Sequence, residues 1–64
     1  MPLTRHKYLV LAGGLYMAYP SLKLSHAEAE AQSSKHGYAE VWQRSPSGTM
    51  AEIVDIYENG RKSR

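Results

Sequence analysis

Two short apolar segments flank a glycine pair near the start of the chain. Residues 8–12 have the sequence YLVLA and residues 15–19 have LYMAY, with Gly13 and Gly14 between them. Glycine reaches the positive φ angles that both central positions of a two-residue type I′ turn need. Pro20 has no N–H to donate to a strand ladder, so it ends the second segment. The pattern therefore predicts a β-hairpin over 8–12 and 15–19.

The same stretch has an alternative interpretation as a secretory leader. Basic residues precede the apolar run, and the small residues of the SHA sequence at 25–27 suit a signal peptidase. The run is too short to cross a bilayer, however, and the glycines split it. Cleavage after Ala27 would leave 37 residues without a disulfide, which is below the size that usually folds alone. We therefore favour the hairpin and expect no membrane contact.

A polar, alanine-rich segment follows and indicates a single helix. Ser25 and Glu28 have the spacing of a capping box, and basic residues stand where the last turn would be. Gly37 suits the left-handed exit of a helix, so we predict a helix over 26–36. Its inner side chains are small, and such a helix must lie close against a flat surface. The inner residues are expected to be Ala27, Ala31 and Ser34.

Two further apolar segments complete a predicted sheet. Strands at about 39–44 and 50–57 are separated by a Ser-Pro-Ser-Gly sequence, which is typical of a type I turn. The element order is then ββαββ. We predict one small α+β domain, residues 1–64, with the helix packed on one face of an antiparallel sheet. The basic termini, 1–6 and 59–64, are expected to be flexible.

The predicted strands are apolar on both sides. In the third strand Val41 points away from Trp42. In the fourth, alternation places Ile53 and Tyr57 on one face and Val54 on the other. One slim helix covers one face only, and monomeric soluble proteins rarely leave a large apolar patch open. The second face is then covered by the chain's own N-terminal residues and tyrosines, by a second copy, or by another protein.

Charge is distributed unevenly along the chain. The net charge is +2, made of +3 over residues 1–24, −2 over 25–42, −2 over 43–58 and +3 over 59–64. Basic ends that keep a small protein soluble explain this pattern, and basic arms for a phosphate backbone are the alternative. The candidate nucleic-acid contacts are Arg5, Lys7, Arg61, Lys62 and Arg64.

The sequence offers little for catalysis or metal binding. There is no cysteine, which fits a reducing cytoplasm and leaves no thiolate ligand. His6, His26 and His36 have no i, i+3 or i+4 spacing that would place two imidazoles on one helix face. A chain of this length also has little room for a walled pocket. We therefore expect a cytoplasmic protein that is not an enzyme, with no catalytic residues, no cofactor and no metal.

Protein binding is the function class that remains. Tryptophan is enriched at binding hot spots, which makes Trp42 a candidate. Arg44 lies two residues further on the same strand face, where its guanidinium could bind a carboxylate of the partner. In size and element order the chain resembles small phage-encoded proteins that inhibit host enzymes. This resemblance implies docking on a larger protein, and we also expect a homodimer. The partner-binding residues are expected to be Trp42, Arg44, Tyr16, Tyr19, Val54 and Ile56.

Nucleic-acid binding is the alternative function. An aromatic sheet with basic ends is typical of proteins that stack bases and hold phosphates, on single-stranded or duplex nucleic acid. The density of positive charge is low, however, and an acidic helix would repel a phosphate backbone laid along it. We therefore favour a protein partner.

Overall fold

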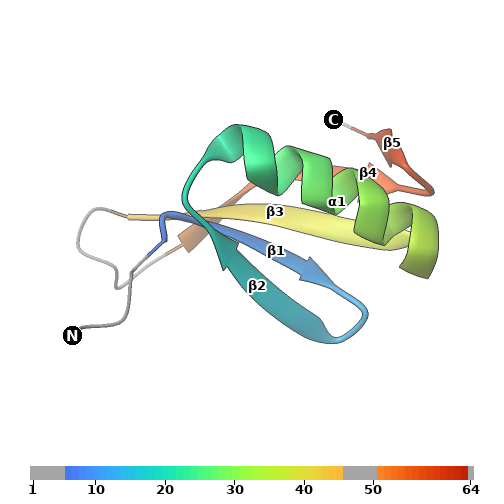
Figure 1. The fold of residues 1–64 in the computed structure, drawn as a ribbon, viewed down its shortest axis with the longest axis horizontal. Coiled ribbons are helices and arrows are strands. Elements are labelled where there is room, and N and C mark those ends of the chain that lie inside the picture. The colour runs from blue at the N-terminus through green and yellow to red at the C-terminus, as the bar shows by residue number, and fades with distance from the viewer. Residues whose placement is uncertain (1–5, 46–50, 64) are drawn as a thin grey trace.

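One helix lies against one face of a five-stranded antiparallel sheet (Figure 1). This computed structural model describes residues 6–45 and 51–63. The strand order is β2-β1-β3-β4-β5, so the helix carries the chain from the β2 edge back to the centre of the sheet. The predicted α+β class is confirmed, with one strand more than expected. The elements are β1 (Tyr8–Ala12), β2 (Leu15–Tyr19), α1 (Leu22–His36), β3 (Tyr38–Arg44), β4 (Ala51–Glu58) and β5 (Arg61–Lys62).

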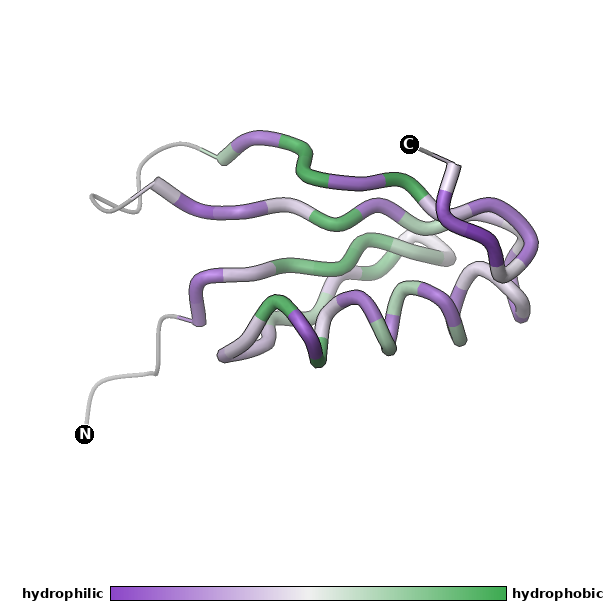
Figure 2. Tube along the Cα trace, turned by 90° about the horizontal axis from the view of Figure 1, so that it is seen from above, coloured by the Kyte–Doolittle hydropathy of each residue, from purple (hydrophilic) through white to green (hydrophobic). Residues whose placement is uncertain are grey.

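The opening hairpin has the predicted strand bounds. Gly13 and Gly14 have φ angles of 62° and 80°, which is the conformation for which glycine is favoured at both turn positions. Hydrophobic residues run along most of β1 and β2 (Figure 2). The glycine pair therefore serves as the turn of a hairpin.

Helix α1 begins one turn earlier than predicted. Ser21 is its N-cap, and the Ser21 Oγ accepts a hydrogen bond of 3.1 Å from the backbone N–H of Leu24. Ser25, the predicted cap, is buried inside the helix, where its hydroxyl donates to the carbonyl of Leu22 at 2.8 Å. A cap needs only a side-chain oxygen at the right distance, and Ser21 supplies it. The predicted exit is confirmed, because Gly37 has a φ of 91°.

The inner stripe of α1 also differs from the prediction. Ser25, Ala29 and Ser33 are buried, whereas Ala27 and Ala31 are not. Alanine was expected in the interior because it has no polar group to satisfy. A serine can be buried when its hydroxyl is bonded within the helix, and Ser33 donates to the carbonyl of Glu30 at 3.0 Å. Ser34, the third predicted inner residue, is exposed.

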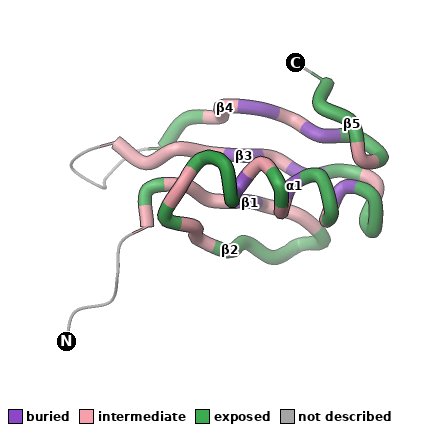
Figure 3. Tube along the Cα trace, turned by 45° about the horizontal axis from the view of Figure 1, so that its top comes forward, coloured by how far each residue is buried: buried purple, intermediate pink, exposed green. Residues whose placement is uncertain are grey.

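The core lies between this stripe and the middle of the sheet. Val10 and Val41 are cross-strand partners, 1% and 0% exposed, and Ala29 at 0% is the buried apolar residue of the helix. Ala39 and Tyr57 extend the core along β3 and β4 (Figure 3). Small residues at the contact let the helix backbone approach the strands closely.

A β-bulge in β4 changes which residues face the helix. Val41 pairs with Asp55 but Trp42 pairs with Ile53, so Val54 is an extra residue. Cross-strand partners share a face, which puts Ile53 with Trp42 on the side away from α1. Val54 packs against the core instead. The predicted faces of Ile53 and Val54 are therefore wrong, because simple alternation does not register an inserted residue.

The C-terminal residues form a turn and a short strand. Asn59 and Gly60 form a turn with φ angles of 51° and 83°, and Arg61 and Lys62 then pair with β4 as β5. The backbone N–H of Gly60 donates to Ser33 Oγ at 2.8 Å, which attaches this turn to α1. The predicted Ser-Pro-Ser-Gly turn and most of the N-terminal arm lie outside the described residues.

We expect the close helix–sheet contact to be sensitive to side-chain size. Replacing Ala29 with leucine forces a large side chain between α1 and the sheet and should lower the free energy of unfolding by about 1–3 kcal/mol. Ala31→Leu is the matched control, because Ala31 is exposed on the same helix. Urea denaturation measures both variants, and equal stability of the two would contradict the close contact.

Candidate protein-binding surface

The sheet face away from α1 carries aromatic and aliphatic side chains from four strands. Strand pairing sets this face, because Leu9 pairs with Trp42 and Leu11 pairs with Glu40. Within residues 6–45 and 51–63, α1 is the one helix, and it lies on the other side (Figure 1). We call this surface the open face. Its central residues are Leu9, Leu11, Tyr16, Tyr38, Glu40, Trp42, Ile53 and Ile56.

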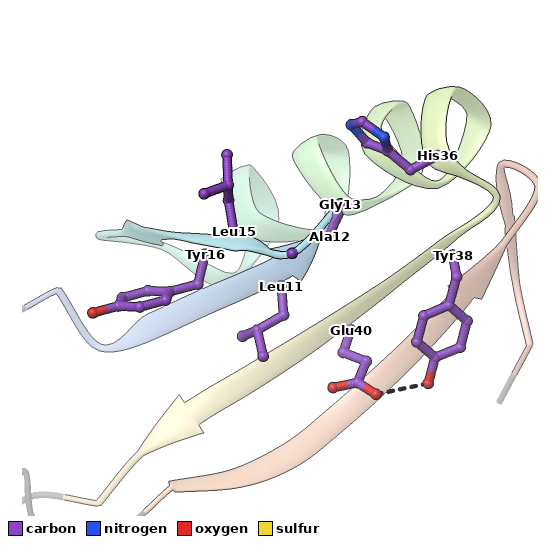
Figure 4. Close-up of a pocket in the computed structure, with 9 residues that line it drawn as sticks. Leu11, Ala12, Gly13, Leu15, Tyr16, His36, Tyr38 and Glu40 are labelled. Atoms are coloured by element: carbon purple, nitrogen blue, oxygen red, sulfur yellow. Dashed lines mark hydrogen bonds between the residues drawn. The ribbon is translucent and has the colours of Figure 1, made fainter.

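A carboxylate holds two aromatic side chains in place on the open face. Glu40 accepts a hydrogen bond of 2.7 Å from the Tyr38 hydroxyl and one of 2.8 Å from the indole N–H of Trp42 (Figure 4 shows the first). The bond to Glu40 raises the pKa of Tyr38, and partial burial and the charges of Glu40 and Glu58 add to this rise. The only tryptophan of the chain is thus fixed in orientation on the surface.

Strand β2 forms an exposed edge of the sheet. Leu15 is 75% exposed and Tyr16 68%. Their side chains point to opposite sides of the strand (Figure 4). After a two-residue turn, Ala12 and Leu15 form a hydrogen-bonded pair, and such pairs alternate with open ones. The backbone N–H and C=O groups of Tyr16 and Ala18 therefore point away from β1. These groups are positioned to pair with another strand.

A groove separates β2 from the C-terminal half of α1. Its volume is about 190 Å³, and a second depression of about 480 Å³ continues around the hairpin tip (Figure 4). The His36 ring lies against Gly13 so closely that a Cβ there would be 3.0 Å from it. Both hollows are open to solvent. The groove is lined by Val10, Ala12, Gly13, Leu15, Tyr16, Met17, Gln32 and His36.

Four of the six predicted partner-binding residues share the open face. Trp42, Ile56 and Tyr16 lie on it, and strand alternation places Arg44 at its end. Tyr19 packs against the core on the α1 side of the sheet. Val54 also packs against the core, because the bulge makes it an extra residue in β4 and changes the face it points to. The structure thus brings together the central group of the prediction and separates Tyr19 and Val54 from it.

The candidate nucleic-acid contacts lie far apart on the sheet. Lys7 precedes β1 and its Nζ lies 5.8 Å from the centre of the Tyr8 ring, whereas Arg61 and Lys62 form β5 at the far edge. Lys62 is also 3.7 Å from the carboxylate of Asp55. Arg5 and Arg64 lie outside the described residues. The described cations therefore do not form one continuous stripe.

Sequence reasoning missed a polar cluster between α1 and β4. His26 Nδ1 lies 2.8 Å from the Tyr57 hydroxyl, and His26 Nε2 lies 3.3 Å from Asp55. Only the packing of the helix on the sheet brings them together, because His26 and Tyr57 are 31 residues apart in the chain. An acid, a histidine and a hydroxyl in this order also occur in nucleophilic sites.

The chemistry of this cluster argues for a structural role. Burial raises the pKa of the Tyr57 hydroxyl, and the charges of Asp55 and Glu30 raise it further. A higher pKa opposes formation of the phenolate that would be the nucleophile. The cluster therefore serves to tie α1 to β4. In the described part of the chain, no three histidine or carboxylate side chains gather as metal ligands would.

Comparisons with known proteins provide no relative from which a role could be transferred. No family model, curated protein or solved structure matches the chain. Within the described ranges, no helix has the length and apolar character needed to cross a membrane. The functional assignment is therefore argued from the surfaces of the molecule.

The carboxylate of Glu40 should control the ionisation of Tyr38. Replacing Glu40 with glutamine removes the negative charge beside the hydroxyl and should lower the pKa of Tyr38. Glu58→Gln is the matched control and should lower this pKa less, because Glu58 acts through charge alone and has the smallest of the four effects. The phenolate absorbance of each protein, compared with its Tyr38→Phe counterpart, measures the pKa. A larger shift in the Glu58→Gln protein would contradict the assigned geometry.

The raised pKa of Tyr57 should make folding sensitive to alkali. The folded state favours the neutral phenol, so its contribution to stability is complete below the usual tyrosine pKa of 10.0 and is lost as pH rises above it. Tyr57→Phe should therefore lose less stability than the parent protein over this alkaline range. Urea denaturation at several pH values measures the difference, and Tyr16→Phe, at an exposed position, is the control. An identical alkaline decline in the parent and Tyr57→Phe proteins would refute this role.

Proposed function

We propose that the protein is a non-enzymatic binding module that docks on a larger protein through the β2 edge and inhibits it. The observation that carries this proposal is an edge strand with exposed apolar side chains, outward backbone groups and no charge. An unprotected edge of this kind is a template for pairing with another strand. The proposed setting is the cytoplasm.

The two edges of the sheet support this choice. Proteins protect exposed edges with short strands and with charged side chains. β5 has both features, because it consists of Arg61 and Lys62 alone. β2 has neither, since its sequence is LYMAY over five residues. The unprotected edge is the one suited to strand addition.

The chemistry of the edge specifies the partner. An extended segment that adds to β2 gains backbone hydrogen bonds to Tyr16 and Ala18, and its alternate side chains point to the two sides of the sheet. On the α1 side they meet the groove beside Leu15 and Met17, and on the other side they meet Tyr16. We therefore propose as partner an extended segment of a larger protein, with apolar residues at alternate positions. We propose that the larger protein is inhibited because β2 occupies this segment.

The nucleic-acid alternative has less support. The described candidate contacts, Lys7 and the pair in β5, lie on different parts of the sheet. Glu40 also places a negative charge among the aromatic side chains of the open face. Both features oppose a continuous path for phosphates. Retention of nucleic acid in the experiment below would nevertheless favour it over a protein partner.

A photo-reactive amino acid at Tyr16 tests the proposal in the cells that make the protein. We expect a cross-link to one larger protein from position 16 and none from position 61 on the β5 edge. Ala18→Pro removes an outward N–H without removing a bond to β1, so it should abolish this cross-link. Ala18→Val keeps the N–H and is the matched control.

Hydrogen exchange on the isolated complex supplies the second measurement. The amides of Tyr16 and Ala18 should exchange at least about tenfold more slowly in the complex than in the free protein, because strand addition pairs them. Equal exchange rates in both states, or a cross-link that Ala18→Pro does not change, would overturn docking at this edge. A cross-link to nucleic acid alone would do so as well.

A further inference from the structure

Glu40 places a carboxylate among the apolar side chains of the open face. It is partly buried, and its cross-strand neighbours, Leu11 and Ile56, are aliphatic. The two hydrogen bonds that it accepts come from uncharged groups, the Tyr38 hydroxyl and the Trp42 indole. These bonds hold the carboxylate in position but leave its negative charge in place.

The charges around Glu40 do not cancel it. Among the described residues both ion pairs are made by Asp55, on the α1 side of the sheet. Arg61 lies on the open face as the cross-strand partner of Glu58, so it offsets the charge of Glu58 first. Arg44 is four residues from Glu40 along β3, or about 13 Å, which is more than the screening length of about 8 Å at physiological salt. The charge of Glu40 is therefore left over.

The carboxylate of Glu40 can accept two more hydrogen bonds. Its Oε2 accepts from Tyr38 and its Oε1 from Trp42, and each carboxylate oxygen has room for about two donors. A guanidinium presents two parallel N–H groups that match the two oxygens, whereas an ammonium does not. Tyr38 and Trp42 stand two residues to either side of Glu40, and aromatic rings attract a guanidinium as well.

A depression gives a ligand access to this carboxylate. Leu11, Tyr38 and Glu40 line the part of the hairpin-tip depression that lies on the open face (Figure 4). Its volume of about 480 Å³ lies within the range of about 300–1,000 Å³ that ligand sites have. Its walls are partly apolar, and a charge pair is stronger where water is partly excluded.

We propose that Glu40, Tyr38 and Trp42 form a binding site for a guanidinium group, which an arginine side chain of the larger protein supplies. A segment added to β2 would lie three strand spacings from β3, or about 14 Å, which is farther than an arginine side chain extends. The arginine therefore belongs to another part of that protein. This choice of source rests on the proposed docking function, whereas the site itself does not.

Titration of the free protein with N-acetylargininamide tests the site. The indole N–H of Trp42 and the methyl groups of Leu11 report binding in NMR spectra recorded at constant ionic strength. We expect saturable shifts with a dissociation constant of about 1–50 mM, because one partly exposed charge pair binds weakly. N-acetyllysinamide should bind at least about threefold more weakly, since it lacks the two parallel donors. The citrulline analogue, which has a similar shape without the charge, should give no saturable shift.

Two variants separate this site from a general attraction to the face. Glu40→Gln should weaken the binding of N-acetylargininamide at least about tenfold, because it removes the charge that the guanidinium meets. Glu58→Gln is the matched control, with the same change of charge on the same face, and should weaken binding less than about threefold. Equal losses in the two variants would overturn the site. Equal binding of the three probes, or no saturable shift at about 200 mM N-acetylargininamide, well above the expected constant, would overturn it as well.

The cross-link from position 16 tests the source of the arginine. Glu40→Gln should lower its yield at least about threefold, and Glu58→Gln should lower it less, because only the first removes a charged contact with the partner. An unchanged yield in Glu40→Gln would exclude the docked protein as the source. A parent protein without any cross-link would instead contradict docking, and the titration would still decide whether the guanidinium site exists.

Discussion

The close approach of one small-residue helix to the sheet is the contact on which this structure depends. Ser25, Ala29 and Ser33 have side chains short enough to bring the helix backbone near Val10 and Val41. A short chain without disulfides must bury what apolar surface it has with few voids. The small helix also determines which surfaces stay uncovered, because it covers only the middle of one sheet face.

Two surfaces of different kinds follow from that limited cover. The open face is wide and presents side chains, so it suits another flat surface. The β2 edge is narrow and presents backbone groups, so it suits an extended segment. The two surfaces meet at Tyr16, which belongs to both. They nevertheless suit partners of different shape.

The hairpin and the fold class could be predicted from local signals, because Gly13 and Gly14 act within a few residues. The helix start could not be predicted with the same accuracy, since Ser21 and Ser25 both have a side-chain oxygen and only tertiary packing selects between them. The predicted faces of Ile53 and Val54 are wrong, because the bulge in β4 arises from its pairing with β3 and alternation along β4 alone does not indicate it. Of the candidate site, the shared face of Trp42 and Arg44 followed from alternation, whereas the pairing that places Tyr16 and Ile56 on the same face depends on the strand order and register. The cluster around His26 required knowledge of how the helix crosses the sheet.

The two ends of α1 are held very differently. At the C-terminal end, Gly60 is bonded to Ser33, and the His36 ring rests on Gly13, so this end is fastened to both margins of the sheet. At the N-terminal end, Leu22 and Leu24 are exposed, and the first contact with the sheet that holds the helix is the His26 cluster. We therefore expect thermal fraying to be confined to the first helical turn and to stop at His26, which is bonded to β4. The hairpin tip and the last helical turn would then persist as one unit while the first turn opens and closes.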